Sequence, residues 1–457
     1  MSTTLPTTSG LGGEIVPGVE DPSNSGFSRR TFLAGTAATA GAAAVVTMGT
    51  RYAFASPEAP ANGDVMVLVF LRGGADGLSL VAPYNMATYR TLRPTIRVKA
   101  PDEFTDPTGK SGLPMVQGGA IPNFALSGTF AMHPGMASLH AGPWTNGNLA
   151  IVHAAGMPAA EETRSHFDGQ KNFEFGTASW NYSTGFLNRY LAGQPGVDRL
   201  AAVGRGGQLQ RSLSGGVAAY SMYSNTSFNV SGYSSNTRAR TALTNWYDAG
   251  TGDLLNQTGA NTMAAIGTLS GINFASPTFA PQNATVYPNT GFANELKEVA
   301  QLIRANVGLR CVAVDIGGWD SHDSMGAPED PASPFRQRAA EFADALSAFY
   351  NDLGTQMNEV TLATISEFGR TINENGSGGT DHGWGSSMFV MGRKIRGGVY
   401  GAFPTSIVDD PQHGDLTVTT DYRRVLSEVL SVRGNAANLS TIFPTFTQQS
   451  ALGMALA

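Results

Sequence analysis

The segment that most constrains the fold is an unbroken apolar run at Val65–Leu71 (VMVLVFL), followed at once by a glycine-rich turn. A run of this length is typical of a strand that is buried on both faces of a parallel sheet. Comparable runs follow at Leu149–His153, Arg310–Asp315 and Val360–Ile365, with a shorter one at Met388–Met391. The chain therefore contains the strands for a buried, multi-stranded sheet.

Helical patterns separate and follow these strands. Apolar residues recur with helical spacing over Pro334–Leu353, and Asp421–Val432 has a second amphipathic pattern. Strands that alternate with helices predict an α/β fold with a doubly wound, mostly parallel sheet flanked by helices. Ligands of such sheets bind outside the carboxyl ends of the strands, so polar residues directly after each apolar run are the first candidates for chemistry.

Region 205–295 differs in composition from the rest of the chain. It is rich in Ser, Asn, Thr and Gly, carries interspersed aromatic residues, and has no strong core pattern beyond a helix predicted at Arg238–Tyr247. This composition predicts an inserted polar cap subdomain. We therefore expect residues 56–457 to form a single α/β hydrolase-like domain that carries this cap.

Residues 1–55 have the features of an export signal. The sequence SRRTFL at 28–33 matches the twin-arginine pattern, an alanine-rich apolar run follows it, and AFA at 53–55 is a small-x-small cleavage site. The apolar run is weak for a bilayer span, which takes about 20 residues. We therefore expect cleavage near Ser56, the twin-arginine translocase as a partner during export, a periplasmic or extracellular protein, and no stable membrane span in the mature form.

The charge of the chain argues against one class of function. Its formal net charge is −6, and charged residues make up 14% of it. Proteins that bind nucleic acids need basic patches, so we expect no nucleic-acid partner.

Acidic and imidazole side chains stand in loops that follow the predicted core strands. The candidates for metal ligands are Asp76, Asp320, His322, Glu367, Asp381 and His382. Because the carboxyl ends of parallel strands share one edge, we expect these side chains to converge on one or more divalent metal ions. Zn²⁺, Mn²⁺ or Fe would suit such ligands, and the sequence does not distinguish Zn²⁺, Mn²⁺ and Ca²⁺. Taken singly, each residue is as readily explained as a helix cap or a loop brace.

Five motifs give the chain a family resemblance: 71–78 (LRGGADGL), 164–170 (RSHFDGQ), 314–322 (VDIGGWDSH), 366–370 (SEFGR) and 376–383 (GSGGTDHG). Almost end to end, the mature chain resembles the bacterial family filed as domain of unknown function 1501. More distantly, that family is similar to the alkaline phosphatase and sulfatase superfamily. This resemblance implies two metals above a parallel sheet, an early Asp, a Ser or Thr nucleophile at a helix start, and later acid and His ligands.

The resemblance also suggests catalytic roles for Arg164, Ser165 and His166. Ser165 would be the nucleophile at a helix start, where the helix dipole favours an anionic substrate. Arg164 would pair with oxygens of the ester, and His166 would be a metal ligand or an acid/base group. The competing interpretation of Ser165 is a helix N-cap.

Two departures from the superfamily pattern affect the metal ligands. Asp320 is followed by His322 after one intervening residue, where the superfamily usually has three. Phe368 stands where the superfamily usually has a histidine, and a phenyl ring cannot bind a metal. Either one metal site is therefore impoverished, or His382 supplies the missing imidazole from a longer loop.

These observations together predict an exported, metal-dependent hydrolase of phosphate or sulfate esters. Its substrate would be a small anionic ester or a sulfated or phosphorylated glycan, and the metal would lower the pKa of the nucleophile. The alternative is a non-catalytic, metal-stabilised surface or carbohydrate-binding protein on a degenerate hydrolase fold, since a fold does not imply a function.

Overall fold

The computed structural model describes residues 64–457, except for 105–108, 116–128, 231–235, 251 and 405–414. The predicted export signal and its cleavage site lie outside the described residues. The described residues from Asp64 to Ala457 belong to one compact unit. Within the described part of the chain, no helix is both long and apolar enough to cross a membrane.

The described residues form a nine-stranded sheet in the order β11-β5-β10-β9-β1-β8-β6-β7, with β12 paired to β5. Its strands are β1 (Val65–Leu71), β5 (Leu149–Gly156), β6 (Ala202–Arg205), β7 (Tyr220–Met222), β8 (Cys311–Ile316), β9 (Val360–Ile365), β10 (Ser386–Met391), β11 (Gly398–Tyr400) and β12 (Thr420–Asp421). Strands β9, β1, β8, β6 and β7 pair in parallel, whereas β10 runs antiparallel to both β9 and β5. The predicted α/β class with a mostly parallel sheet is confirmed, but β10 makes the sheet mixed.

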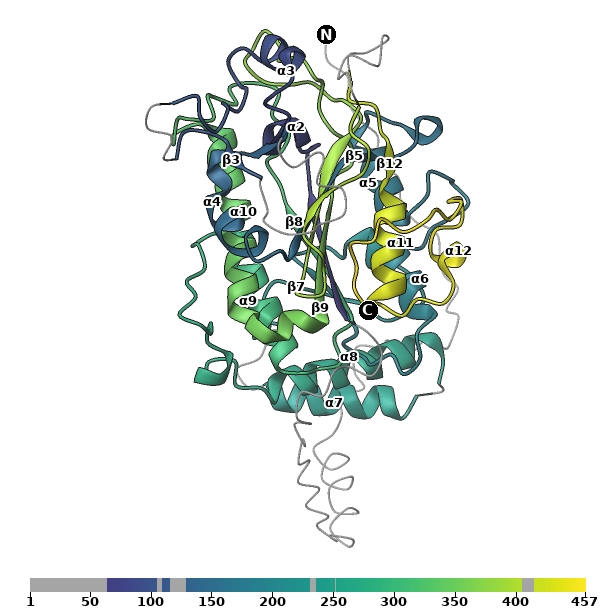
Figure 1. Ribbon diagram of the computed structural model, residues 1–457. Helices are drawn as coiled ribbons and strands as arrows, with labels where there is room; N and C mark the ends of the chain where they lie inside the picture. The colour runs from purple at the N-terminus through teal and green to yellow at the C-terminus, as the bar shows by residue number, and fades with distance from the viewer. Residues whose placement is uncertain (1–63, 105–108, 116–128, 231–235, 251, 405–414) are drawn as a thin grey trace, which may run out of the picture. The chain divides into compact units, whose positions relative to one another are not determined.

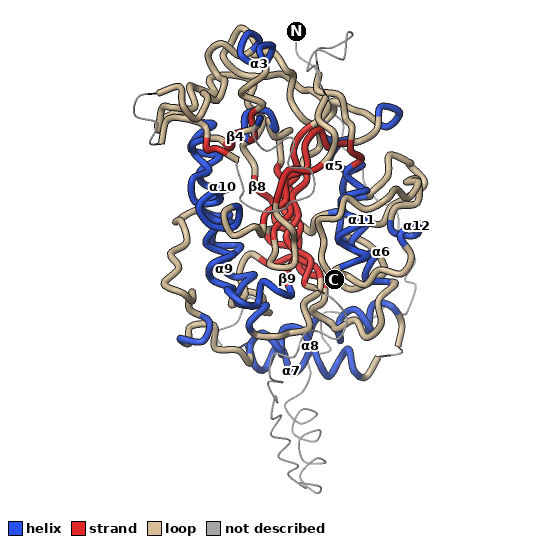
Figure 2. Tube along the Cα trace, viewed as in Figure 1, coloured by secondary structure: helices blue, strands red, loops and turns tan. Residues whose placement is uncertain are grey.

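Helices cover both faces of the sheet (Figures 1 and 2). One face carries α9 (Gly291–Arg304) and α10 (Pro334–Leu353), and the other carries α5 (His166–Phe175), α6 (Phe186–Ala192) and α11 (Tyr422–Val432). Alternate residues of β1 explain this arrangement. Val65, Val67 and Val69 belong to the core cluster that contains α9 and α10, whereas Met66, Leu68 and Phe70 belong to the cluster that contains α6 and α11. The apolar run is continuous because both of its faces are buried.

The shorter elements of the described chain include helices α2 (Gly77–Leu80), α3 (Ala87–Leu92), α4 (Ala137–Leu139) and α12 (Leu439–Ile442), and a small sheet of β2 (Val81–Ala82), β4 (Ala131–Met132) and β3 (Leu113–Pro114).

Region 205–295, predicted as an inserted cap, does not lie wholly apart from the sheet. Its strand β7 is an edge strand of the main sheet, parallel to β6. The helices α7 (Asn236–Asp248) and α8 (Leu254–Ser270) pack against each other. Residues 237–248 of α7 include no buried side chain, whereas the end of α8 buries Ala265 and Leu269 in the core. Among the described residues of this region, α7 therefore lies at the surface, whereas β7 and the end of α8 belong to the main fold.

The direction of β10 determines where its preceding loop lies. Since β10 is antiparallel to β9, its first residue, Ser386, lies at the edge where β9 and β1 end. The loop before β10 thus meets the loops that follow β1, β8 and β9.

Candidate metal centre

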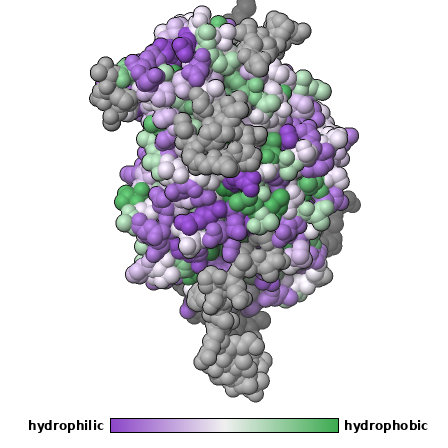
Figure 3. All heavy atoms as spheres, viewed as in Figure 1, coloured by the Kyte–Doolittle hydropathy of each residue, from purple (hydrophilic) through white to green (hydrophobic). Residues whose placement is uncertain are grey.

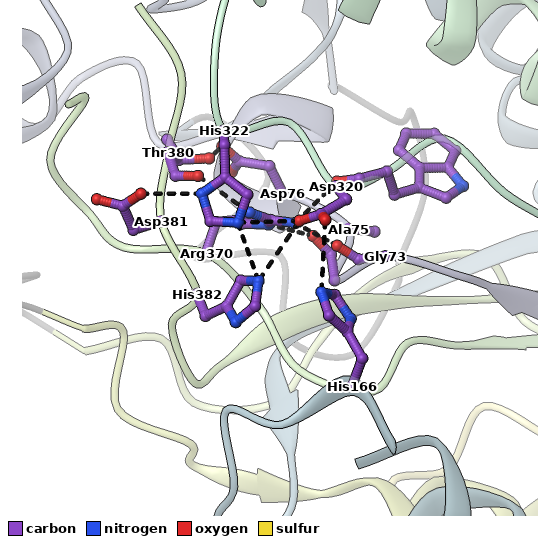
Figure 4. Close-up of polar contacts among 12 residues, drawn as sticks. Gly73, Ala75, Asp76, His166, Asp320, His322, Arg370, Thr380, Asp381 and His382 are labelled. Atoms are coloured by element: carbon purple, nitrogen blue, oxygen red, sulfur yellow. Dashed lines mark hydrogen bonds and ion pairs between the residues drawn. The ribbon is translucent and has the colours of Figure 1, made fainter. Parts of the chain in front are cut away.

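Three loops and the start of one helix deliver polar side chains to this edge of the sheet (Figure 4). Asp320 and His322 follow β8, Glu367 and Arg370 follow β9, Asp381 and His382 precede β10, and His166 is the first residue of α5. Residues that are more than 200 positions apart in the chain therefore become neighbours.

The carboxylate of Asp320 lies at the centre of three imidazole rings. Its oxygens are 3.1 Å from Nε2 of His322, 3.4 Å from Nε2 of His382 and 3.5 Å from Nε2 of His166. The Nε2 atoms of His322 and His382 are 3.0 Å apart. Ligand atoms of His166, Asp320 and His382 all lie within 4.8 Å of one another, which is the compactness that one metal ion requires.

The other ring nitrogen of each histidine contacts an oxygen that can only accept a hydrogen bond. Nδ1 of His166 lies 2.9 Å from Glu367 Oε1, and Nδ1 of His322 lies 2.9 Å from Asp381 Oδ1. Nδ1 of His382 lies 2.8 Å from the carbonyl oxygen of Arg164. Each Nδ1 must therefore carry the hydrogen. In a neutral ring, Nε2 then has no hydrogen and presents its lone pair. This outer arrangement is the one that orients histidines on metals.

These tautomers create an unusual contact between His322 and His382. Their Nε2 atoms face each other at 3.0 Å, and two neutral rings would present two lone pairs with no hydrogen between them. A cation between the rings would remove this conflict. Two nitrogen ligands at 2.0–2.1 Å from a tetrahedral ion are about 3.3 Å apart, close to the observed spacing.

The charges around the cluster favour the protonation states that bind metals. Burial alone would raise the pKa of Asp320, but the hydrogen bond and the charge of Arg370 outweigh burial and lower it. Nη2 of Arg370 lies 2.5 Å from Asp320 Oδ1. The pKa of Asp381 is lowered, chiefly by its hydrogen bond with His322, and the pKa of His382 is lowered, chiefly by burial. Asp320 is thus an anion and His382 a neutral base at neutral pH, as metal binding requires.

Phe368 and Gly73 explain how the loops pack so closely. The ring centroid of Phe368 lies 4.9 Å from that of His166 and 4.6 Å from that of His382, so the phenyl ring supports both imidazoles. Gly73 has φ +121°, and a Cβ there would lie 2.5 Å from the backbone nitrogen of Asp320. Only glycine lets the turn after β1 touch the loop that carries Asp320.

Three of the six expected metal ligands lie outside the cluster: Asp76, Glu367 and Asp381, which contacts Nδ1 of His322 at 2.9 Å. Asp76 caps α2 through Ser79 N and pairs with Arg93 at 2.8 Å, and both members of this pair are buried. Glu367 is buried too, and it accepts hydrogen bonds from Gly73 N at 2.8 Å and from His166. Asp76 therefore braces the loop after β1, whereas Glu367 orients a histidine. Sequence spacing gave no sign of Arg93 as the partner of Asp76.

The three expected catalytic residues also separate. His166 joins the cluster, whereas the hydroxyl of Ser165 accepts a bond from Asp168 N at 3.4 Å and caps α5. Arg164 forms ion pairs with Asp415 and with Glu162. The contribution of Arg164 that sequence reasoning missed is its backbone carbonyl, which orients His382.

The sequence profile described as Protein of unknown function (DUF1501) matches residues 64–423. The chain belongs to this family. The match confirms the resemblance that the five motifs indicate, and the range shared with DUF1501 includes every residue of the cluster. No curated protein matches this DUF1501 chain.

Proposed function

We propose that this DUF1501 protein binds one divalent transition-metal ion through His166, Asp320, His322 and His382. The observation that carries the proposal is the convergence of three Nε2 atoms on one carboxylate, with each Nδ1 held by an oxygen acceptor. Three imidazoles favour Zn²⁺, Fe or Mn²⁺ over Ca²⁺, which prefers oxygen ligands. Ca²⁺ therefore fits these ligands poorly.

We further propose that the metal centre hydrolyses phosphate or sulfate esters. The side chains of Asp320 and His322 are 48% and 44% exposed, so the cluster opens to solvent, whereas structural metal sites are closed. Arg370 forms an ion pair with Asp320 and offsets its negative charge. A bound ion would therefore keep a net positive charge, which would attract an anionic ester. Such an ion supplies a lowered pKa for water and stabilises developing negative charge.

The distant likeness to alkaline phosphatases and sulfatases supports the reaction class but not two metals. The order of Asp320, His322 and His382 along the chain, at the carboxyl edge of a mostly parallel sheet, is compatible with that superfamily. Asp76 pairs with Arg93, so the early ligand of that superfamily pattern is already engaged here. We therefore propose a centre that holds one ion. In this centre His382 supplies the imidazole that the superfamily pattern has at the position of Phe368.

Metal analysis of protein purified after native export tests the proposal. We expect about one equivalent of metal per chain, lowered at least tenfold in His166→Ala and His382→Ala. His140→Ala is the matched control, because His140 contacts the carbonyl oxygen of Pro114 and lies outside the cluster. Hydrolysis of aryl phosphates and sulfates should vanish on chelation and return with added metal.

The outcomes separate the two functions. Equal metal content in wild type and both variants would refute the centre. A full complement of metal that raises the melting temperature, with no hydrolysis of any ester, would favour the metal-stabilised, non-catalytic alternative.

Export through the twin-arginine route belongs to the same proposal, because that route carries proteins that have already folded in the cytoplasm. Replacement of Arg29 and Arg30 by lysine should retain the precursor in the cytoplasm, and exported protein should begin near Ser56. Unchanged export of the double variant in a fractionation assay would refute this route.

A further inference from the structure

Two exposed aromatic rings are associated with α5, the helix that begins with His166 of the candidate metal centre. Phe167 is 82% exposed and Trp180 is 78% exposed, although most of the large apolar side chains of the described residues are buried. On the face drawn in Figure 3, hydrophilic residues likewise separate small hydrophobic patches. Isolated exposed apolar residues are ordinary, so the position of these two decides what they signify.

Both rings are linked to α5, the helix that begins with His166. Phe167 follows His166 directly, and Lys171 lies one helical turn beyond Phe167 on the same face. The ammonium of Lys171 lies 3.0 Å from the ring centroid of Trp180 and 6.0 Å from that of Phe175. Phe167, Lys171 and Trp180 are here called the α5 strip, in which Lys171 lies about 7.5 Å along the helix axis from His166.

The composition of the α5 strip favours a sugar over a protein partner. Protein interfaces are centred on contiguous, desolvated apolar patches, whereas the charged amine of Lys171 lies over the Trp180 ring of this strip. The loop around Trp180 exposes Asn181 and Ser183, which can hydrogen-bond hydroxyl groups. A flat aromatic ring packs well on the apolar C–H face of a pyranose ring, and the hydroxyl edge of the sugar remains available to polar neighbours.

The positive charge of Lys171 favours a sugar that carries an anionic substituent. Lys171 is half-buried, and its amine lies beside an aromatic face, where it can also pair with an anionic substituent. The chain as a whole carries a net charge of −6, so attraction of an anion here depends on local charge.

We propose that the α5 strip binds the sugar rings of a glycan that carries sulfate or phosphate esters, so that one ester reaches the metal centre. The second half of this statement rests on the proposed function; the binding of the glycan does not. The strip is therefore a binding surface for the part of the substrate that does not react, which would increase selectivity for polymers over small esters.

Affinity electrophoresis in the presence of EDTA tests binding without turnover. The probes are dextran sulfate and chondroitin sulfate, with polyacrylate as an anionic polymer that lacks sugar rings. We expect both sulfated polymers to retard the wild type at least tenfold more strongly than polyacrylate does. Trp180→Ala and Phe167→Ala should each lose at least tenfold in apparent affinity, because each removes one stacking surface.

The matched control is Trp246→Ala, which removes another exposed aromatic residue, on α7, and should bind as the wild type does. All three rings are exposed, so the variants should keep the melting temperature of the wild type. Wild-type affinity in Trp180→Ala and Phe167→Ala, equal retardation by polyacrylate, or no retardation by either sulfated polymer would each overturn the proposal.

Hydrolysis separates failure of this proposal from failure of the proposed function. If small aryl esters are hydrolysed, Trp180→Ala should keep their kcat/KM and lose at least tenfold on a sulfated polymer. If no ester is hydrolysed, the proposed function fails, and the electrophoresis still decides whether the strip binds glycans.

Discussion

Glu367 is the residue that should decide whether His166 can serve as a metal ligand. Its buried carboxylate contacts Nδ1 of His166 at 2.9 Å and Nε2 of Gln170 at 3.0 Å, yet it lies outside the ligand cluster. Glu367→Gln would replace a charged acceptor with a neutral one and lower the basicity of the ring. We expect metal affinity to fall by about 10–100-fold, as measured by competition with a chelator.

Glu374→Gln is the control for that measurement. Glu374 also braces a loop, through Thr95 N at 2.9 Å and Ile96 N at 3.1 Å, but it contacts none of the three histidines in the described structure. An equal loss of affinity in both variants would mean that loop stability, and not the orientation of His166, controls metal binding.

Ser165 should behave as a helix cap and not as a nucleophile. Its hydroxyl accepts a hydrogen bond from Asp168 N at 3.4 Å at the start of α5. Ser165→Ala should therefore cost about 1 kcal/mol of stability, measured by thermal unfolding, and leave esterase activity within about threefold of the wild type. A loss of several orders of magnitude in turnover with unchanged metal content would restore the role of nucleophile.

At the scale of the elements, α11 holds the C-terminal segment through one side chain. The buried carboxylate of Glu428 accepts hydrogen bonds from Gly453 N at 3.1 Å, Met454 N at 2.6 Å and Ala455 N at 2.8 Å, and another from Leu452 N. Glu428→Gln would remove the negative charge. It would also place an amide NH₂ group, which donates hydrogen bonds, against backbone N–H groups that are donors themselves. We expect a loss of about 3 kcal/mol in the free energy of unfolding, measured with urea.

A carboxylate on α10 offers the comparison. Glu341 pairs with Arg338 at the partly exposed surface, so Glu341→Gln should cost about 0.5 kcal/mol or less. Similar losses in the two variants would show that the C-terminal segment contributes little to the stability of the fold.

At the scale of the whole molecule, buried histidines should make the fold sensitive to acid. Burial lowers the pKa of His133 to about 3 and that of His153 to about 3, against 6.5 for an exposed ring. Between these values the unfolded chain binds protons that the folded chain excludes. The free energy of unfolding should therefore fall with pH, from 6.5 toward 3, by about 1.4 kcal/mol per pH unit for each histidine.

Urea unfolding of wild type and His153→Gln between pH 7 and pH 4 measures this effect. The variant should be less stable at pH 7, because the ring of His153 stacks on Phe130, but its stability should fall less steeply toward pH 4. Parallel slopes in the two proteins would contradict burial of a neutral His153.

Local pattern predicted most of the core. The bounds of β1, β9 and α10 are those expected from apolar runs and helical spacing, because strands buried on both faces and amphipathic helices are visible in short windows. The direction of β10 and the place of β7 at the sheet edge were not visible, since strand pairing joins residues that are distant in the chain.

The candidate site was predicted only as a set of residues. Asp320, His322 and His382 meet as expected from their positions at strand ends, and His166 joins them from α5. Asp76 does not, because Arg93 occupies its carboxylate, and no spacing rule connects these two residues. The hydrogen-bond partner of each Nδ1 could not be predicted from the sequence either, since it depends on the packing of separate loops.

The sequence by itself determined the family, the α/β class and the residue types available at the edge of the sheet, because these follow from motifs and from periodic burial. Only the tertiary structure decided which residues face one another. It placed Glu367, Asp381 and the carbonyl of Arg164 behind three imidazoles, and so turned their Nε2 atoms toward Asp320. The physical reason is that hydrogen-bond direction and close packing act between loops that the chain brings together only when it folds.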